Sequence, residues 1–295
     1  NCHKPPISPI TIEHPPLRDW RNRMRITVRI SLLLTITAVL AACTTTEETP
    51  IADVPEIRPG LLQGYLPMDD PLDSHAFVPS PPEPGSPEQA ADDAFSERML
   101  TLQDTARWEL AAADAHLGFP AAADTFACAL GVPISESQTP ALYMLMRRTL
   151  ADLGLATYPA KNAYQRKRPF LVNGKPICSP EEQEELATDG SYPSGHTAIG
   201  WGWALILSEL APDRAEQLLA RGAAYGESRN VCNVHWRSDV QAGMMVGAAA
   251  YARLQNNAEF NTAMTAARVE IAEAREKAMS PQRDCEAEAA ALATR

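Results

Sequence analysis

The sequence predicts an all-α fold, and three observations lead to this prediction. Valine, isoleucine and threonine rarely alternate with polar residues, so the pattern of a half-buried strand is almost absent. Apolar residues instead recur at helical spacing in several runs, which proline and glycine separate. Outside one N-terminal segment, no apolar run reaches about 18 residues, the length expected of a membrane-spanning helix.

The predicted helices follow one another along the chain, joined by loops that contain proline and glycine. Ser86 and Pro87 fit the N-cap and the first helical position of the first helix. Thr139 and Pro140 fit the same two positions in the third helix. The predicted helices cover residues 86–115, 121–130, 139–155, 195–210, 213–227, 236–254 and 257–278.

Residues 24–42 have the pattern of a lipoprotein-type signal peptide. Met24 opens a short basic region, the apolar run Ile30–Leu40 follows, and small residues precede Cys43. The apolar run is too short to cross a membrane. A cysteine directly after a cleavage site of this form resembles the lipobox of bacterial lipoproteins, so we expect a lipid anchor on Cys43. Ordinary secretion, with Cys43 as a spare thiol, is the alternative.

The rest of the chain divides into a folded domain and three flanking segments. Residues 1–23 contain no methionine and read as an upstream extension of the reading frame, not as a folded element. Residues 43–61 are expected to form a tether, because a segment rich in Pro, Thr, Asp and Glu buries little apolar surface. The folded domain is expected over residues 62–279, with a flexible tail over 280–295.

The charge of the chain argues against binding to nucleic acid. The sequence holds 26 Lys and Arg against 37 Asp and Glu. Residues 1–42 contain six of the basic and two of the acidic side chains, so the chain from Cys43 on carries a net charge of about −15. Nucleic-acid binding relies on a basic face that neutralises phosphates. Any phosphate that this protein binds is therefore expected to meet a local pocket of cations.

Four cysteines follow Cys43, and an even number in an exported protein permits two disulfides. Cys128, Cys178, Cys232 and Cys285 allow three pairings. We favour Cys178–Cys232, because both residues flank segments that carry candidate chemistry. Free buried cysteines are the alternative. No Cys/His spacing indicates a zinc site, and we expect no metal.

The segment Ser228–Asp239 contains the first group of candidate catalytic residues. His235 and Asp239 are four residues apart and share a face of a predicted helix, so the carboxylate can fix the orientation of the imidazole. Arg229 lies six residues before His235 and brings a permanent cation. A histidine, its carboxylate and a nearby arginine indicate phosphoryl chemistry.

Two further clusters supply groups that bind anions. Lys161 and Arg168 lie in a basic run within an acidic protein. The segment Pro193–His196 lies where an apolar helix is predicted to begin. Helix N-termini present unpaired N–H groups, so Ser194 and Gly195 are placed to bind phosphate oxygens.

Other basic residues and histidines are expected to have no catalytic role. Arg166, Lys167 and Arg237 are interpreted as solvated or paired surface charges. His75 and His116 stand outside any motif, so a structural role is expected for them.

The spacing of the three clusters resembles the signature of the PAP2 (phosphatidic-acid-phosphatase type 2) superfamily, K-x6-RP, PSGH and SR-x5-H-x3-D, and every fixed position matches. Within that superfamily the chain is similar to the class A bacterial non-specific acid phosphatases. The segments Gly190–Thr197, Arg168–Phe170 and Pro84–Ser86 carry this similarity, which extends over about residues 62–275. The resemblance implies a helical bundle with its site at helix ends.

The resemblance also implies a role for each motif residue. His235 is implied as the nucleophile that forms a phosphohistidine, and Asp239 as the carboxylate that orients it. His196 is implied as the general acid that later activates water. The implied phosphate-binding residues are Lys161, Arg168, Ser194, Gly195 and Arg229. No cofactor is implied, because these cations take the part that a metal ion plays in other phosphatases.

The function implied is that of a non-specific acid phosphatase acting on small phosphate monoesters. Low pH favours protonated His196, whereas His235 attacks unprotonated, so a bell-shaped pH profile is expected. A phosphotransferase side activity is compatible with this mechanism. We expect a periplasmic homo-oligomer tethered to the outer membrane, whose only membrane contact is the lipid on Cys43. Asn233 and Val234 stand where many relatives have glycine and an aromatic residue, which leaves substrate preference open.

Three other functions remain open at the level of sequence. A lipid or isoprenyl phosphate phosphatase shares the same motifs, although such enzymes usually carry several membrane spans. A vanadium haloperoxidase binds vanadate in a similar anion pocket. A lipoprotein that binds an anion or a partner without catalysis is the non-enzymatic alternative.

Overall fold

The computed structural model describes residues 54–294, and helices dominate this part of the chain. The sheet formed within it is a two-stranded antiparallel hairpin of β1 (Glu56–Arg58) and β2 (Leu61–Leu62). The prediction of an all-α fold is therefore confirmed. No helix in residues 54–294 combines the length and the apolar character needed to cross a membrane. Cys43 and the expected signal peptide at residues 24–42 lie outside the described residues.

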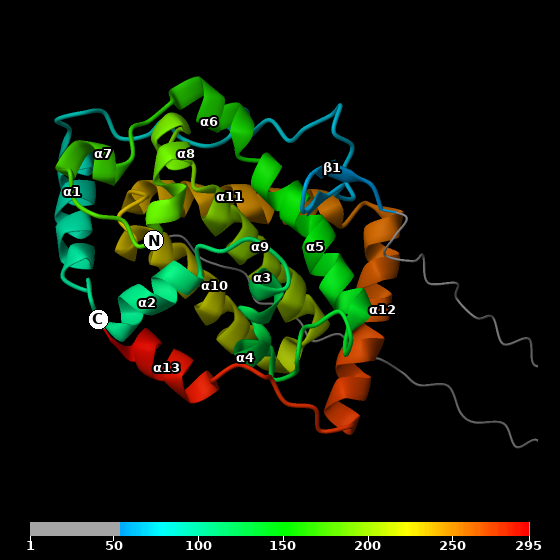
Figure 1. The fold of residues 1–295 in the computed structure, drawn as a ribbon. Coiled ribbons are helices and arrows are strands. Elements are labelled where there is room, and N and C mark those ends of the chain that lie inside the picture. Colours follow the sequence, from blue (N-terminus) through cyan, green and yellow to red (C-terminus); the bar gives the residue numbers. More distant parts are fainter. Residues whose placement is uncertain (1–53, 295) are drawn as a thin grey trace, which may run out of the picture. The chain divides into compact units, whose positions relative to one another are not determined.

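Helix α9 (Gly195–Leu210) lies in the middle of the bundle (Figure 1). It packs against α5 (Pro140–Leu155), α10 (Ala215–Val231) and α11 (Arg237–Leu254). Helix α12 (Ala258–Glu276) covers the outer side of α5. The sequence of α9 is apolar on nearly all sides, which is typical of a buried helix.

The shorter helices and turns surround this core. They are η2 (Ser74–Ala76), α1 (Pro87–Leu100), α2 (Ala106–Ala113), α3 (Ala121–Asp124), α4 (Ala127–Leu130), α6 (Tyr158–Tyr164), α7 (Pro169–Asn173), η3 (Pro180–Glu182), α8 (Gln183–Thr188), η4 (Pro212–Arg214) and α13 (Cys285–Ala293). Ser86 caps α1, accepting a hydrogen bond from the backbone N–H of Gln89, and Pro87 occupies its first position, as predicted.

Glycines allow α9 to lie unusually close to its neighbours. A Cβ atom at Gly222 of α10 would stand 2.5 Å from the Cβ of Ala204 in α9. A Cβ atom at Gly243 of α11 would stand 2.6 Å from the carbonyl oxygen of Ser194. The second contact brings the start of α11 against the start of α9, where the candidate site residues lie.

The prediction of one helix over residues 86–115 is wrong. The chain leaves the helical conformation after Leu100, and Asp104 adopts a left-handed conformation at φ 61° before α2 begins. The break gives α2 its own packing direction against α10, where buried Arg107 reaches Ser228. The helix predicted over 121–130 is likewise divided, into α3 and α4.

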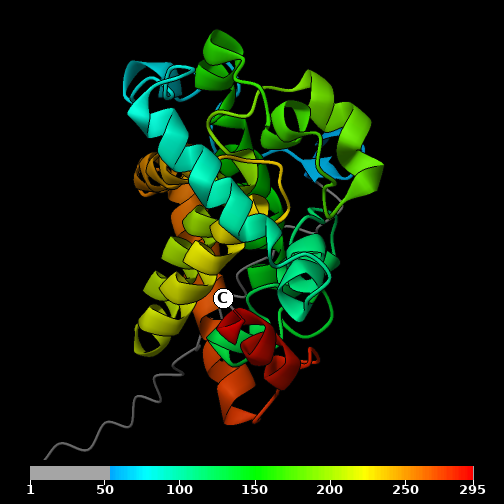
Figure 2. The ribbon, with the colours of Figure 1, turned by 90° about the vertical axis from the view of Figure 1, so that its left-hand side faces the viewer.

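The C-terminal end also differs from the expected flexible tail over 280–295. Residues 285–293 form α13 (red in Figure 2), and Cys285 at its start is disulfide-bonded to Cys128 on α4. Glu288 of α13 pairs with Arg221 at 3.4 Å and with Arg283 at 2.6 Å. A covalent bond and buried ion pairs thus hold a segment that was expected to be flexible because of its position at the C-terminal end.

The N-terminal boundary of the folded part lies earlier than expected. The tether was expected over residues 43–61, yet residues 56–62 form the hairpin. Leu61 and Leu62 are buried, and β2 packs against α5. Buried apolar side chains therefore fix this end of the domain.

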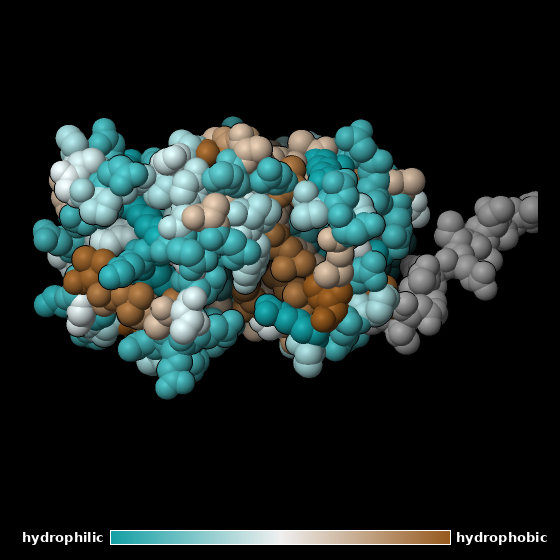
Figure 3. Space-filling model, turned by 90° about the horizontal axis from the view of Figure 1, so that it is seen from above, coloured by the Kyte–Doolittle hydropathy of each residue, from teal (hydrophilic) through white to brown (hydrophobic). Residues whose placement is uncertain are grey.

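The surface of the described part is mostly polar. Hydrophilic residues make up most of the face shown in Figure 3, with apolar residues in smaller patches. Large hydrophobic side chains that remain exposed are Met68, Phe77, Leu155, Tyr158, Leu171, Val172, Met245 and Val269. The helices thus turn their apolar sides to the core and their polar sides to water.

Candidate active site

The candidate site lies where the N-termini of α9 and α11 meet. The hydroxyl of Ser194 caps α9 by accepting a hydrogen bond from the backbone N–H of Thr197 at 3.3 Å. The carboxylate of Asp239 accepts the backbone N–H of Trp236 at 2.8 Å and so caps α11. The backbone N–H of Ser194 donates to the carbonyl oxygen of Asp239 at 3.0 Å. These bonds lock the two helix starts together.

This geometry changes the expected role of the α9 N-terminus. Ser194 and Gly195 were both expected to offer backbone N–H groups to phosphate. The N–H of Ser194 is already bonded to Asp239, whereas the N–H of Gly195, at the first helical position, has no acceptor within the helix. Gly195 is therefore the better placed backbone donor of the two.

His235 and Asp239 form the pair that their spacing predicts. Nδ1 of His235 lies 3.4 Å from Oδ2 of Asp239, and both side chains are buried. Nε2 of His235 lies 3.0 Å from Nη1 of Arg168, a group that only donates. These partners assign the proton to Nδ1 and leave the lone pair of Nε2 directed at the cations.

Arg168 and Lys161 share one acidic partner. Asp189 Oδ2 lies 3.0 Å from Nη2 of Arg168 and 3.2 Å from Nζ of Lys161. Lys161 also donates to the carbonyl oxygen of Gly190 at 2.6 Å. Burial, followed by the charge of Arg168, lowers the pKa of Lys161 to about 8. Lys161 therefore still carries its charge in the acidic range.

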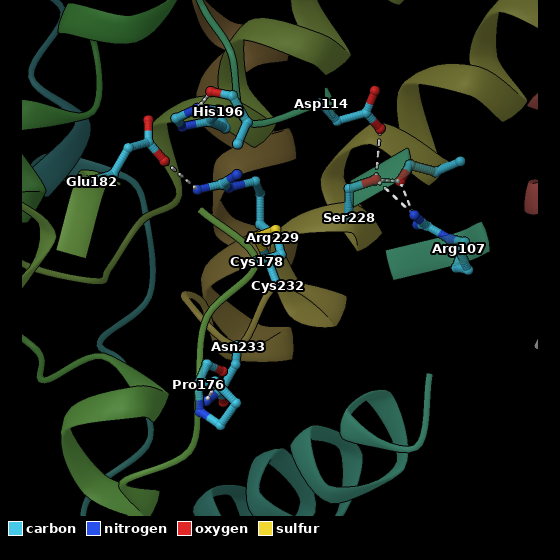
Figure 4. The surroundings of a disulfide bond; sticks show 12 residues. Arg107, Asp114, Pro176, Cys178, Glu182, His196, Ser228, Arg229, Cys232 and Asn233 are labelled. Atoms are coloured by element: carbon cyan, nitrogen blue, oxygen red, sulfur yellow. Dashed lines mark hydrogen bonds and ion pairs between the residues drawn. A yellow bond between two sulfur atoms is a disulfide. The ribbon is translucent and has the colours of Figure 1, made fainter. Parts of the chain in front are cut away.

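Arg229 is the least satisfied cation of the site. Its side chain is fully buried, and none of its three guanidinium nitrogens has a hydrogen-bond partner within residues 54–294. The nearest carboxylate, that of Glu182, lies 3.8 Å away (Figure 4). Buried donors without acceptors are costly, so this guanidinium is the group in the site that most needs an anionic partner.

The backbone holds Arg229 and His235 in a fixed relation. The carbonyl oxygen of Arg229 accepts hydrogen bonds at 3.2 Å from the backbone N–H groups of both Val234 and His235. The side-chain amide of Asn230 donates to the carbonyl oxygen of His235 at 3.0 Å. The motif Ser228–Asp239 is thus a tight turn between α10 and α11 that brings cation and imidazole together.

His196 enters the site from the first turn of α9. Its Nε2 lies 2.9 Å from the carbonyl oxygen of Ala115, which can only accept, so the proton belongs on Nε2 and Nδ1 is left for other partners (Figure 4). Burial, followed by the charges of Arg229, Arg168 and Lys161, lowers the pKa of His196 well below its ordinary value.

The same influences act on His235. Burial, followed by the charges of Arg168, Lys161 and Arg229, lowers the pKa of His235 well below its ordinary value. An unprotonated imidazole is the form that can attack phosphorus, so these surroundings suit a nucleophile that works at acidic pH.

A buried ionic network supports Ser228, the neighbour of Arg229. The hydroxyl of Ser228 donates to Asp114 at 2.6 Å and accepts from Nη1 of Arg107 at 2.9 Å (Figure 4). Arg221 donates to both oxygens of Asp114, at 3.1 and 2.5 Å. Asp114 directly precedes Ala115, so this network also fixes the carbonyl group that orients His196.

The disulfide Cys178–Cys232 is confirmed. Cys232 follows α10 and lies three residues before His235, so the bond ties the loop containing Cys178 to the turn between α10 and α11 (Figure 4). Asn233 reinforces the link, donating at 3.2 Å to the carbonyl oxygens of both Lys175 and Pro176. Asn233 has a φ of 62°, a conformation that asparagine tolerates better than most residues.

Arg166 is not the surface charge that the sequence suggested. Only 8% of its side chain is exposed, and it pairs with Asp239 at 2.6 Å and with Asp92 at 2.8 Å. Ser191 is a further residue that sequence reasoning missed, since its hydroxyl donates to Asp239. Lys167 and Arg237 are exposed, as expected.

Two of the residues that support the site could have been found from their position in the sequence. Asp189 and Ser191 lie directly before the segment Pro193–His196, so their position in the chain indicates the site. Asp92 has no such signal, because 74 residues separate it from Arg166.

Together these groups suit phosphoryl transfer. An unprotonated imidazole nitrogen, a second imidazole and three buried cations converge around one position. No group of three or more His, Cys, Asp and Glu side chains in the part of the chain that the structure describes is arranged to hold a metal ion.

Comparison with known proteins identifies the family of the chain. The model of the PAP2 superfamily matches residues 141–259. The chain is 43% identical over 209 residues to a non-specific acid phosphatase of Providencia stuartii, covering 70% of this chain and 84% of the relative. It is 43% identical over 216 residues to an acid phosphatase of Zymomonas mobilis, covering 72% and 79%. It is 36% identical over 211 residues to a non-specific acid phosphatase of Salmonella typhimurium, covering 71% and 84%.

The fold and the site thus define a member of the PAP2 superfamily. Within it, the chain belongs to the class A bacterial non-specific acid phosphatases, which are phosphoric monoester hydrolases.

Proposed function

We propose that this protein hydrolyses a broad range of small phosphate monoesters through a phosphohistidine formed on Nε2 of His235. The observation that carries the proposal is the placement of that nitrogen beside Arg168, with the unsatisfied guanidinium of Arg229 in the same buried cluster. An imidazole nitrogen among fixed cations is suited to attack a phosphorus atom whose oxygens those cations hold.

In the first step, Nε2 of His235 bonds to phosphorus and the bond from phosphorus to the ester oxygen breaks. Nδ1 of His196, in its protonated form, gives a proton to the departing oxygen, so an alcohol leaves. The phosphorylated imidazole is positively charged while Nδ1 of His235 keeps its proton. Asp239 accepts that N–H and stabilises the positive charge.

In the second step, His196 takes a proton from water, and the resulting hydroxide bonds to phosphorus. The bond from phosphorus to Nε2 of His235 breaks, and inorganic phosphate leaves. Both imidazoles return to their starting states. An alcohol that replaces this water would yield a new ester, and we include this phosphotransferase side activity in the proposal.

The cations supply most of the stabilisation of the transferring group. Each contact of a full charge at ~4 Å contributes roughly 4 kcal/mol at an effective dielectric constant of 20, before desolvation. Asp189 and Glu182 are the carboxylates that pair with these cations, and both are partly exposed. We infer that a bound phosphate dianion replaces these carboxylates as the ion-pair partner of Lys161, Arg168 and Arg229.

The proposed location is the periplasm, with a lipid on Cys43 as the only membrane attachment. The sequence pattern of residues 24–43 supports this location, and the two disulfides agree with an oxidising compartment. We also propose that the protein forms a homo-oligomer. Mass spectrometry of the mature N-terminus tests the anchor, because an unmodified start after residue 43 would reject it.

Hydrolysis of p-nitrophenyl phosphate in the presence of EDTA tests the proposed function. We expect wild-type protein to be active and His235→Ala to lose at least about 10³-fold in kcat/KM, since the nucleophile is removed. His75→Ala is the matched control, because His75 is an exposed histidine outside the site. Equal activity of His235→Ala and wild type would reject the mechanism. Bromide oxidation with vanadate and peroxide, without ester hydrolysis, would instead indicate a haloperoxidase.

A further inference from the structure

We propose that Arg166 is a positioning residue, which aims the carboxylate of Asp239 at His235 and extends the range over which that carboxylate is ionised toward lower pH. The inference rests on the phosphohistidine function proposed above. It adds to the site a residue that lies outside the three motifs.

Arg166 bridges two helices that meet beside the site. Its side chain leaves the segment after α6 and reaches the start of α11, where Nη1 donates to Oδ1 of Asp239 at 2.6 Å and to the hydroxyl of Ser238 at 2.7 Å. Nη2 donates to Asp92 at 2.8 Å and to Gln89 at 2.6 Å, both on α1. The guanidinium therefore has an acceptor for each terminal nitrogen and is held in one orientation.

Arg166 also orients the second oxygen of Asp239 through Ser191. The carbonyl oxygen of Arg166 accepts the backbone N–H of Ser191 at 2.8 Å. The hydroxyl of Ser191 in turn donates to Oδ2 of Asp239, the oxygen that faces Nδ1 of His235. Both carboxylate oxygens thus depend on Arg166, one directly and one through its backbone.

Several charged groups influence Asp239, and Arg166 is the cation in direct contact with its carboxylate. The pKa of Asp239 is raised to about 6 by burial, although the charge of Arg166, the largest of the opposing influences, holds it lower than burial alone would. Other titratable or charged groups near the carboxylate are Lys161, Arg168, Tyr192 and His235, with Asp92 on the far side of Arg166. Without Arg166, this carboxyl group would take up a proton at a higher pH.

Protonation of Asp239 would disable the nucleophile. A neutral carboxyl group holds Nδ1–H of His235 less firmly and no longer balances the charge of the phosphohistidine. Because His235 and Asp239 are in contact, the acid limb of the pH profile belongs to the pair and not to one residue. Loss of Arg166 raises the proton affinity of the pair, whichever of the two residues takes up the proton.

A merely structural role for Arg166, holding α1 against α11, predicts a different result. Such a role lowers stability, or lowers activity by the same factor at every pH. The electrostatic role instead makes the loss depend on pH. The acid limb of kcat/KM, which reports the free enzyme, separates the two.

The experiment compares kcat/KM for p-nitrophenyl phosphate across the acidic and neutral range in four proteins. They are wild type, Arg166→Gln, Asp92→Asn and the control Lys167→Gln, which removes the same charge from an exposed neighbour. We expect Arg166→Gln to move the acid limb of kcat/KM to higher pH by about 1 pH unit or more. At a pH below the limb, kcat/KM then falls about tenfold relative to wild type. We expect Asp92→Asn to move the limb down, because Asp92 no longer competes for Arg166. The control should match wild type.

Opposite shifts in the two variants are the signature of the proposed role. A profile of Arg166→Gln that runs parallel to that of wild type would overturn the proposal. If Arg166→Gln does not fold, the profile of Asp92→Asn tests the proposal. An acid limb of Asp92→Asn that stays at the wild-type pH or moves to higher pH would overturn the proposal. Wild-type protein without phosphatase activity would reject the proposed function itself, whereas active wild type with unmoved limbs rejects only the role of Arg166.

Discussion

At the scale of single residues, His196 combines two properties that conflict in the surroundings the structure describes. The proposed mechanism needs it protonated to assist the leaving group, yet burial and three cations lower its pKa well below the ordinary value. A bound phosphate dianion would counter those cations and raise the pKa of His196. Substrate binding itself would then prepare the general acid.

If substrate binding raises the pKa of His196, the alkaline limbs of the pH profiles of kcat and kcat/KM differ. Activity that needs protonated His196 is lost as pH rises through its pKa. The limb of kcat/KM reports the free enzyme and the limb of kcat reports the substrate complex. We therefore expect the alkaline limb of kcat at a higher pH than that of kcat/KM, in profiles measured with p-nitrophenyl phosphate. Limbs at the same pH, or in reverse order, would contradict this role of His196.

Arg229 predicts opposite effects on activity and stability. Replacing it in Arg229→Met removes a cation that we propose binds phosphate, so kcat/KM should fall by roughly 10²–10³-fold. The same change removes a buried guanidinium that lacks hydrogen bonds, so Tm should rise by about 2–4 °C, the shift that 1 kcal/mol gives a protein of this size.

The control for this prediction is Arg107→Met. Arg107 is as buried as Arg229, but it donates hydrogen bonds to Ser228 and to the carbonyl oxygen of Ala224. Its loss should lower Tm in a thermal unfolding scan. A Tm of Arg229→Met that falls as far as that of Arg107→Met would show that Arg229 serves mainly to hold the fold.

Most residues of the candidate site could be predicted from the sequence, but the residues that support them could not. His235, Asp239 and Arg229 come from one short turn, so their spacing alone predicts their proximity. Arg166 was misjudged, because its burial depends on Asp92, a residue of a different helix. A charge that is satisfied by a distant segment cannot be told from a solvated one by local pattern.

At the scale of elements, the end of α2 links the two sides of the site. Asp114 binds Arg221 and Ser228, and the next residue, Ala115, accepts a hydrogen bond from His196. The break between α1 and α2, which the continuous apolar pattern did not predict, allows this end to reach α10. The interruption of one predicted helix thus places Asp114 and Ala115 beside the site.

This arrangement predicts a large effect of Asp114→Asn on stability. The substitution keeps the shape of the side chain but removes the carboxylate that accepts two hydrogen bonds from the buried guanidinium of Arg221 and one from the hydroxyl of Ser228. We expect the free energy of unfolding, measured by chemical denaturation, to fall by about 3–5 kcal/mol.

Asp213→Asn is the matched control for this change. Asp213 also pairs with an arginine, Arg275 at 3.0 Å, but both side chains are substantially exposed. Exposed ion pairs add little to stability, so the control should stay close to wild type. Equal effects of the two substitutions would show that the Asp114 network does not stabilise the domain.

At the scale of the whole molecule, helix type and order could be predicted better than the way the chain ends are held. The sequence pattern predicted α5, α9, α11 and α12 to within a few residues, because each is a long helix that turns one or more faces to a common core. Helix α13 is short and is held by the disulfide to Cys128 and by ion pairs, which are long-range features. The local sequence pattern does not predict such contacts.

The bundle brings together three clusters that lie far apart in the sequence, from Lys161 to Asp239. Close packing of α11 on α9 at Gly243 and the disulfide Cys178–Cys232 hold the helix ends that carry them. The central claim about the assembled site is that Nε2 of His235 takes the phosphoryl group before water does.

Trapping the intermediate tests that claim most directly. Wild-type protein is mixed rapidly with a substrate that carries a ³²P-labelled phosphoryl group and quenched in alkali, in which phosphohistidine survives, and the labelled peptide is mapped. We predict label on His235, and none in His235→Ala. Label on another residue, or full turnover by wild type without any label on His235, would contradict the mechanism.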